Sequence, residues 1–125
     1  MPEIRDATVR DLPDVMNVLD GAVLRADAAA VRGHIADDEV LVAVAEADAE
    51  RVLGALVLDG THIDAVAVRR QRRGQGIGTA LVEAAADRRG RLTAAFDADL
   101  RPFYETLGFT VEQTDEPGRL WGERD

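Results

Sequence analysis

Residues 66–85, VAVRRQRRGQGIGTALVEAA, decide how this chain is interpreted. The stretch passes from an apolar segment typical of a strand, through a loop rich in arginine and glycine, into the first turns of a helix. Gly74, Gly76 and Gly78 permit positive φ angles, so that successive N–H groups can point at one anion near the positive end of the helix dipole. Four cationic side chains accompany them: Arg69, Arg70, Arg72 and Arg73. The sequence therefore predicts a phosphate-binding loop.

Two common nucleotide-binding motifs do not fit this loop. A nucleotide P-loop places a lysine and then a serine or threonine after its last glycine, but Gly78 is followed directly by Thr79 and the chain contains no lysine. In a dinucleotide fingerprint the third glycine would fall at Thr79 or at Leu81. The remaining interpretation is a pyrophosphate site that requires no metal and is built from backbone N–H groups and a helix N-terminus.

Composition narrows the class of protein. The 125 residues, 46% of them hydrophobic, suffice for one domain with a single core. A formal net charge of −9 argues against general affinity for nucleic acid, which needs cations over a broad face. With no cysteine and two histidines, neither disulfides nor a protein-bound metal is expected. No segment has the roughly 20 apolar residues of a membrane span or the apolar core of a signal peptide, so we expect a cytoplasmic location.

The choice of charged residues is unusual. All 15 cationic residues are arginine, and acidic or alanine-rich segments such as residues 37–39 and 46–50 dominate the polar stretches. A high-GC genome would favour alanine, arginine and aspartate in this way. The pattern also resembles that of halophilic proteins. In that case self-repulsion among the carboxylates would make the stability of the fold depend on salt, which screens it.

Hydrophobic periodicity and turn residues predict alternating short elements. The expected strands are residues 4–8, 40–45, 52–58, 62–68, 92–96, 109–112 and 120–122. The first helix should follow Asp11 as its N-cap, with apolar residues at helical spacing at Leu12, Val15, Met16, Leu19 and Val23. Further helices are expected over residues 27–35, 77–89 and 100–107. A polar turn over residues 46–50 and the Asp59-Gly60 pair should separate the three central strands.

The expected order is β-α-α-β-β-β-α-β-α-β-β, which describes an α/β domain. Its central sheet should be mixed and mostly antiparallel, with flanking helices, because the hairpins are antiparallel. The strand, helix and strand from His62 to Phe96 should form the parallel exception.

Two segments carry a resemblance to a known family. Residues 71–76, QRRGQG, resemble the Q/R-x-x-G-x-G/A signature of the GNAT superfamily of N-acetyltransferases, placed between a strand and a helix as in that family. Residues 102–109, PFYETLGF, resemble the family's F-Y-x-x-x-G-F segment, in which a helix ends at a glycine and enters a strand. Together with the element order, the resemblance covers nearly the whole chain. It implies a GNAT-like fold and a single acetyltransferase domain over residues 1–125.

The resemblance also implies a site for acetyl-CoA, which would be the cosubstrate, without a metal. In such enzymes the pyrophosphate lies on the loop amides, and the pantetheine arm pairs with the end of the preceding strand, where it splays from the next. The implied contacts are Ala67, Val68, Gln71, Arg72, Arg73, Gly74, Gln75, Gly76, Ile77 and Gly78, with support from Arg69 and Arg70. Family members often have asparagine at the place of Asp97. An ionised carboxylate there accepts hydrogen bonds but cannot donate one.

Acetyl transfer from a thioester to an amine needs a neutral amine, stabilisation of an oxyanion and protonation of the leaving thiolate. Tyr104 suits the last task, because a phenol, whose ordinary pKa is about 10, is protonated at neutral pH. The alternative role for Tyr104 is an aromatic anchor between helix and sheet. The motif around it favours the catalytic role.

Two residues are candidates for the base that takes the ammonium proton. Asp64 and His62 are two apart on an expected strand and would therefore share one face beside the proposed thioester path. Family members often carry an acidic residue near Asp64, which makes Asp64 the first choice and His62 the second. The alternatives are a histidine in solvent and an aspartate that accepts from a neighbouring N–H.

The function predicted from these residues is transfer of an acetyl group from acetyl-CoA to a primary amine by direct attack. A non-catalytic acetyl-CoA sensor or assembly module of the same fold would have the same loop, but Tyr104 favours the enzyme. A small nucleotide-binding or redox domain is disfavoured by the failed fingerprints. The acceptor, a small-molecule or peptide amine, is not specified by any motif. Family members often form homodimers, and neither nucleic acid nor membrane is an expected partner.

Overall fold

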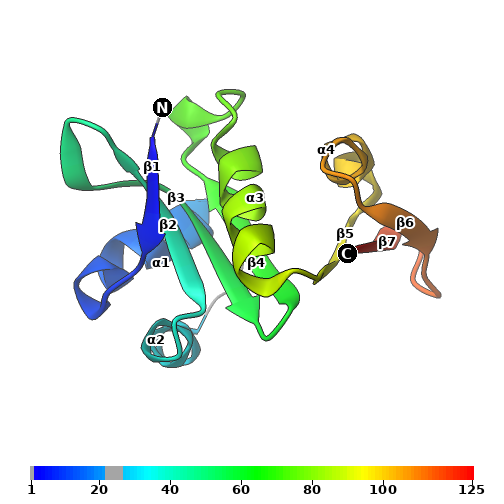
Figure 1. Ribbon diagram of the computed structural model, residues 1–125, viewed down its shortest axis with the longest axis horizontal. Coiled ribbons are helices and arrows are strands. Elements are labelled where there is room, and N and C mark those ends of the chain that lie inside the picture. Colours follow the sequence, from blue (N-terminus) through cyan, green and yellow to red (C-terminus); the bar gives the residue numbers. More distant parts are fainter. Residues whose placement is uncertain (1, 22–26) are drawn as a thin grey trace.

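A computed structural model describes residues 2–21 and 27–125, which form a seven-stranded sheet with helices packed on it (Figure 1). The strands are β1 Glu3–Asp6, β2 Val40–Ala45, β3 Asp48–Asp59, β4 His62–Val68, β5 Leu92–Asp97, β6 Thr110–Gln113 and β7 Arg119–Arg124. The helices are α1 Leu12–Gly21, α2 Ala28–Ala36, α3 Ile77–Arg89 and α4 Arg101–Thr106. Short 3-10 turns cover Val9–Asp11, Arg70–Arg72 and Ala98–Leu100. The predicted order of strands and helices is confirmed.

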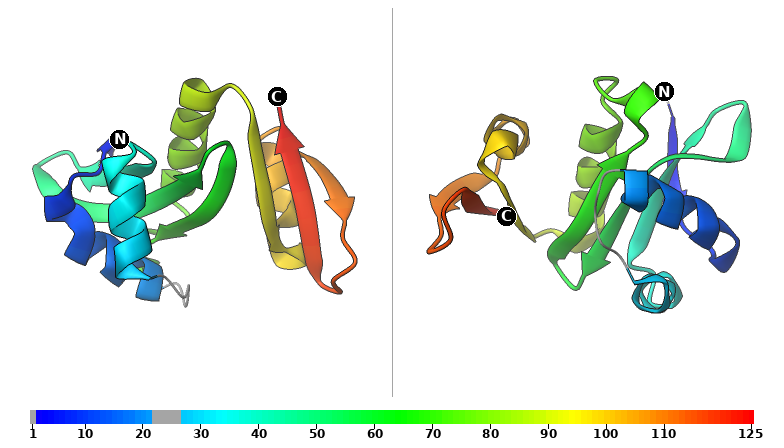
Figure 2. Two further views of the ribbon diagram at one scale, coloured as in Figure 1. Left: turned by 90° about the horizontal axis from the view of Figure 1, so that it is seen from below. Right: turned by 180° about the vertical axis from the view of Figure 1, so that it is seen from behind.

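The strands lie in the order β1-β2-β3-β4-β5-β7-β6. Neighbouring strands are antiparallel except β4 and β5, which run parallel and are connected through α3. Their ladder has two register pairs, His62 with Thr93 and Ile63 with Ala94. Beyond these pairs the two strands diverge, and Figures 1 and 2 show the sheet parting into one section with β1 to β4 and another with β5 to β7. The predicted mixed, mostly antiparallel sheet is confirmed.

Apolar side chains fill a core on each face of the sheet. On one face α1 and α2 bury residues such as Val15 and Val31. On the other face α3 and α4 bury residues such as Leu81 and Leu107. Each fully buried side chain of this size contributes roughly 1.5–3 kcal/mol relative to an exposed one. The two cores fix the sheet from both sides and so define where β4 and β5 can part.

A glycine in β3 permits close packing of α3 on the sheet. A Cβ added at Gly54 would come within 3.1 Å of the Ile77 side chain and within 3.0 Å of the Ala67 carbonyl oxygen. Both distances are shorter than ordinary van der Waals contact, so a side chain at this position would push α3 away from β4. Gly54 therefore helps to set the position of the first turn of α3.

The predicted N-cap at Asp11 is wrong. The cap is Thr8, which begins the 3-10 turn leading into α1, and Asp11 occupies the third position of that turn. Its carboxylate accepts from the Thr8 N–H at 2.8 Å and from both terminal nitrogens of Arg5 at 2.8 and 3.0 Å. The hydrogen bonds from Arg5 are the main reason why the pKa of Asp11 is lowered. A buried carboxylate is tolerated here because it reaches back to the cap and is paired.

Other differences concern where elements begin and end. The polar turn predicted over residues 46–50 is shorter, because Ala45 pairs with Asp48 and extends the hairpin into polar residues. The next turn lies one residue later than predicted, since Asp59 pairs with His62 across a two-residue loop. The predicted helix over residues 100–107 is α4, preceded by the 3-10 turn Ala98–Leu100. The predicted helical position Val23 lies outside the described residues.

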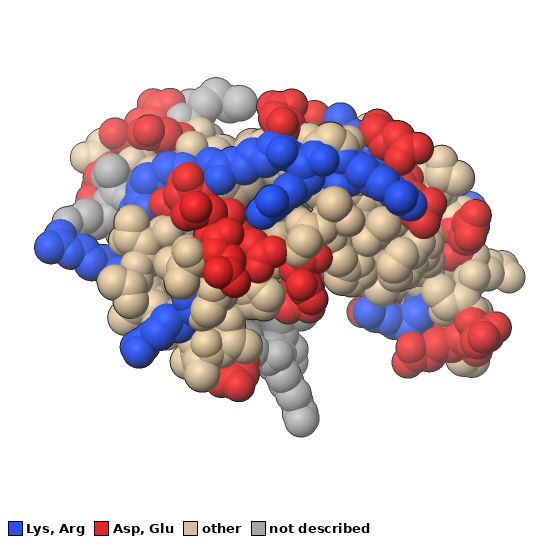
Figure 3. Space-filling view, turned by 60° about the horizontal axis from the view of Figure 1, so that its bottom comes forward, with Lys and Arg blue, Asp and Glu red and all other residues tan. Residues whose placement is uncertain are grey.

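Many arginines pair with carboxylates from distant elements. On the face drawn in Figure 3, basic side chains form a band with acidic clusters beside it. Arg124 on β7 binds Glu83 on α3 with two hydrogen bonds, at 3.0 and 3.3 Å, which link the two sections of the sheet. Arg88 near the end of α3 binds Asp6 on β1.

None of the helices formed by residues 2–21 and 27–125 is long and apolar enough to cross a membrane.

Glu39 ties the end of α2 to the turn between β3 and β4. Its side chain accepts from the Gly60 N–H at 2.7 Å and lies 2.9 Å from Nδ1 of His34. These two contacts, the Gly60 hydrogen bond first, lower the pKa of Glu39 from its ordinary value of 4.5. Because the folded pKa lies below the unfolded one, the ionised side chain stabilises the fold above the unfolded pKa, and this contribution is lost as pH falls through the folded pKa.

Replacing Glu39 with glutamine is therefore expected to lower the free energy of unfolding by about 1 kcal/mol at pH 7. The difference from the unchanged protein should vanish at a pH low enough to protonate Glu39 in the folded state. Urea unfolding at pH 7 and at a series of lower pH values measures this difference. Glu105→Gln is the matched control, since Glu105 is exposed and pairs with Arg101 at helical spacing. Equal effects of the two substitutions at pH 7 would contradict the prediction.

Candidate coenzyme pocket where β4 and β5 part

The gap between β4 and β5 forms a pocket of about 670 Å³, within the range usual for small-molecule sites. It receives residues from the end of β4, the arginine-glycine loop, the start of α3, the end of β5 and α4. Its lining consists of Val66, Ala67, Val68, Arg72, Arg73, Gly74, Gly76, Ile77, Gly78, Thr79, Asp97, Leu100, Phe103 and Tyr104. Both sequence motifs therefore meet in one cavity.

Two glycines shape the loop above this pocket. Gly74 and Gly76 have φ angles of +80° and +81°, in the left-handed region that favours glycine. Gly76 is the N-cap of α3, and its carbonyl accepts from the Ala80 N–H at 3.0 Å. The N–H groups of the first helical turn have no acceptor within the helix, and Ile77, Gly78 and Thr79 line the pocket. This arrangement fits an anion at the positive end of α3.

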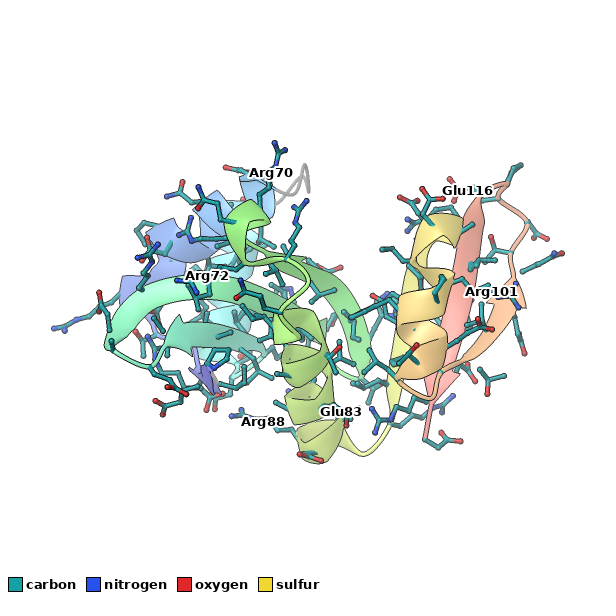
Figure 4. All side chains as sticks on the ribbon, turned by 90° about the horizontal axis from the view of Figure 1, so that it is seen from above. Arg70, Arg72, Glu83, Arg88, Arg101 and Glu116 are labelled. Carbon is teal, nitrogen blue, oxygen red and sulfur yellow. The ribbon has the colours of Figure 1, made fainter. Side chains whose placement is uncertain are left out.

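The arginines of the loop divide into two groups. Arg72 and Arg73, both predicted contacts, line the pocket. Arg69 does not: its Nε donates to the Val52 carbonyl at 2.6 Å and thereby anchors the loop on β3. Arg70 projects outward at the tip of the loop (Figure 4). Neither Arg69 nor Arg70, which were expected to support the phosphate, is among the residues that line the pocket.

Two more predicted contacts, Gln71 and Gln75, are absent from the lining of the pocket. Conversely, four lining residues had not been predicted as site residues: Val66, Thr79, Leu100 and Phe103. Phe103 belongs to the F-Y-x-x-x-G-F segment and faces Gly78, where an added Cβ would lie 3.5 Å from the ring. Leu100 is 45% exposed, which is unusual for leucine beside a cavity. Three of these residues had features in the sequence that could have indicated a role in the site. Thr79 has a hydroxyl in the first turn of a helix, Leu100 is an apolar residue next to a helix start, and Phe103 is the first aromatic of the second motif.

The end of β4 presents backbone to the pocket. On one side this strand pairs with β3, up to Val68 with Gly54. On the other side its ladder with β5 ends at Ile63 and Ala94, whereas Val66, Ala67 and Val68 line the gap. Such an edge offers N–H and C=O groups to an extended molecule, and the Val68 carbonyl there accepts from Nε of Arg73 at 3.2 Å. The predicted contacts Ala67 and Val68 therefore lie on the open edge of β4.

Tyr104 reaches the pocket from an aromatic cluster. Its ring stacks on Phe96, with centroids 4.0 Å apart, and meets Phe103 and Phe109 edge-on at 5.1 and 5.2 Å. Tyr104 is 3% exposed. Burial raises the pKa of Tyr104 to about 12, although the charge of Arg119 acts in the opposite direction. The phenol therefore keeps its proton throughout the physiological range, and its ring cannot move far.

The two base candidates do not line the pocket. In β4 the register shifts, because Val57 pairs with Ala65 and Leu58 with Ile63, so that Asp64 has no opposite residue. The regular alternation from which a shared face of His62 and Asp64 was inferred does not hold at this bulge. Asp64 is exposed there.

His62 lies at the start of β4 and is held by two neighbours. Its Nδ1 lies 2.8 Å from the Thr93 Oγ1, and its ring stacks on Trp121 with centroids 5.4 Å apart. Leu120, beside Trp121 in β7, is buried in the core with α4, so Trp121 and His62 lie on the opposite face of the sheet. When Nδ1 donates to Thr93, Nε2 carries the free lone pair.

Asp97 lines the pocket at the end of β5, where its side chain is paired. Its Oδ1 accepts from a terminal nitrogen of Arg119 at 3.0 Å. Asp97 therefore lies beside the cavity in which the coenzyme is expected.

Within the described part of the chain, no three His, Asp or Glu side chains gather in an arrangement that could hold a metal ion.

Comparison with known proteins gives a consistent picture. The family model described as an acetyltransferase (GNAT) domain matches residues 17–119. Rv2747 from Mycobacterium tuberculosis, solved in complex with CoA, has a TM-score of 0.85 and 17% identity over 98% of both chains. The PaiA N-acetyltransferase from Thermoplasma acidophilum, in complex with coenzyme A, has a TM-score of 0.79 and 16% identity over 100% of this chain and 99% of its own. A comparison with curated proteins gave no match.

Proposed function

Because the chain belongs to the GNAT family of acetyltransferases, we propose that it transfers the acetyl group of acetyl-CoA directly to a primary amine. One observation carries this proposal. The anion loop at the start of α3, the free edge of β4 and the buried phenol of Tyr104 all line one cavity. A pyrophosphate, an extended amide chain and a leaving thiolate need these three features, in that order along one ligand.

The coenzyme would lie along this cavity. The amides of Ile77, Gly78 and Thr79 would receive its pyrophosphate, with Arg72 and Arg73 as nearby cations. The backbone edge of β4 would pair with the amides of the pantetheine arm. Rv2747 and the PaiA N-acetyltransferase, which share this fold, were solved with CoA bound, which supports the assignment.

The transfer would use two groups of this chain in sequence. A base takes one proton from the acceptor, whose neutral nitrogen then attacks the thioester carbonyl, and N–H groups along the edge of β4 stabilise the resulting oxyanion. As the carbon–sulfur bond breaks, Tyr104 gives its proton to the departing sulfur. The nitrogen loses its second proton as the amide forms, and this proton restores the phenol through solvent. The base returns the first proton to solvent, so charges and protons balance.

Thiol release tests this function. The protein is incubated with acetyl-CoA and, in separate reactions, with amino acids, polyamines, aminoglycosides or peptides with free N-termini and lysines. We expect at least one acceptor to accelerate release of free CoA, with the acetylated amine identified by mass spectrometry. Binding of acetyl-CoA without transfer to any acceptor would instead favour the non-catalytic sensor. Failure to bind acetyl-CoA would contradict the whole proposal.

The base is proposed to be Asp64 or His62. Because neither residue lines the coenzyme pocket, it would act through water. Asp64→Asn should abolish the acidic limb of the kcat/KM profile if Asp64 is the base, with a loss of about 100-fold at neutral pH. The same loss after His62→Gln would assign the role to His62, whose ring Thr93 and Trp121 already orient. His34→Gln is the matched control, because His34 pairs with Glu39 away from the pocket. An unchanged limb in both variants would leave bulk water as the acceptor.

A further inference from the structure

Asp97 creates an electrostatic problem for the proposed reaction. Its carboxylate lines the same pocket as Tyr104, the residue proposed to give its proton to the leaving sulfur. Two like charges that share a partly closed cavity raise each other's energy. An unpaired Asp97 would therefore oppose departure of the thiolate.

Arg119 is held in a position from which its positive charge can offset the charge of Asp97. It is the register partner of Asp97 in the β5–β7 ladder, so the two side chains leave neighbouring strands at the same level. Its backbone is fixed on both sides: its N–H donates to Glu116 at 3.1 Å, and its carbonyl accepts from the Thr114 hydroxyl at 2.9 Å. The guanidinium then donates to Asp97 at 3.0 Å.

The pair contributes little to stability. The side chains of Arg119 and Asp97 are 38% and 69% exposed, and exposed ion pairs are worth about 0–1 kcal/mol. Asp97 nevertheless lines the coenzyme pocket, where its charge can act on the reaction. The charge of Arg119 also favours a lower pKa of the Tyr104 phenol, against the larger effect of burial.

We propose that Arg119 is a positioning residue of the acetyl transfer, whose charge offsets Asp97 and so permits negative charge to develop on the departing sulfur. This inference rests on the proposed function. Arg119 itself need not touch the coenzyme, because it acts through Asp97 and through its field. Arg119 is the first residue of β7 and lies outside both sequence motifs.

A double-mutant cycle tests the role. Arg119→Ala alone should lower kcat about tenfold while the KM for acetyl-CoA stays within about twofold. Asp97→Asn should restore most of this activity in the double variant, because no uncompensated carboxylate remains. Arg119→Lys should keep most of the activity, since the charge is retained. A merely structural role for Arg119 would not be rescued at Asp97.

Arg101→Ala is the matched control. Arg101 is exposed, pairs with Glu105, and lies away from α3 in Figure 4. Its replacement should leave kcat unchanged. Equal losses from Arg119→Ala with aspartate and with asparagine at position 97 would overturn the inference, as would an unchanged or raised kcat. Absence of transfer by the unchanged protein would overturn the proposed function itself, and this role with it.

Discussion

Replacing Tyr104 with phenylalanine is expected to lower kcat for acetyl transfer about 100-fold or more, with less than a threefold change in the KM for acetyl-CoA. The substitution removes only the hydroxyl. The ring can keep its stack on Phe96 at 4.0 Å and its edge contacts, so the shape of the pocket is preserved. The lost step is proton transfer to the sulfur. Steady-state kinetics at saturating acceptor measure both constants.

The raised pKa of Tyr104 also affects the expected pH profile. With its pKa at about 12, the phenol is protonated across the working range, so it should add no basic limb to the kcat profile below about pH 11. Phe109→Leu is the matched control for Tyr104→Phe. Phe109 contacts the same ring but does not line the pocket, and its loss should reduce stability with little change in kcat. A Tyr104→Phe enzyme of full activity would remove the phenol from the mechanism.

Gly76→Val is expected to raise the KM for acetyl-CoA at least about tenfold. Gly76 has a φ of +81° and caps α3, and a β-branched residue disfavours that conformation strongly. Relaxing the strain would rotate the peptide and redirect the N–H groups that face the anion. A Cβ meets no protein atom within 4 Å at this position, so the effect would come from backbone geometry and from the ligand.

Gly60→Val is the matched control. Gly60 has a φ of +63° in the turn between β3 and β4, and an added Cβ there also meets nothing within 4 Å. Both substitutions should lower stability by about 1–3 kcal/mol through backbone strain. Coenzyme affinity, measured by calorimetry, should fall at Gly76 alone. Equal affinity losses in the two variants would mean that the loop at Gly76 acts only through stability.

The fold was largely predictable because local patterns agree with one another. Alternating apolar runs and turn residues such as Asp59-Gly60 each specify an element or a boundary, and the structure has these elements within a few residues. The backbone conformation of the loop in the candidate site was also predictable, because the glycines at 74 and 76 indicate positive φ angles. Main-chain geometry is encoded locally and can be read from sequence.

Features that depend on long-range pairing could not be predicted. The bulge at Asp64 arises from the register between β3 and β4, and nothing in residues 62–68 marks it. Arg69 and Arg72 are indistinguishable in the sequence, but one bonds a carbonyl of β3 and the other lines the pocket. Arg119 becomes relevant only because β7 inserts between β5 and β6 and brings it level with Asp97. Such placements are set by tertiary contacts.

The short ladder between β4 and β5 gives the molecule a mechanical character. Two register pairs, the contacts of His62 with Thr93 and Trp121, the Glu83–Arg124 link and the chain through α3 join the two sections of the sheet. Beyond the two register pairs β4 and β5 are not paired, so the two sections are held together at one end of these strands. A molecule that pairs with the free edge of β4 would bridge the two strands where they are not paired. The bound cosubstrate would then make the sheet more rigid during turnover, and the sheet would be less rigid again after the cosubstrate is released.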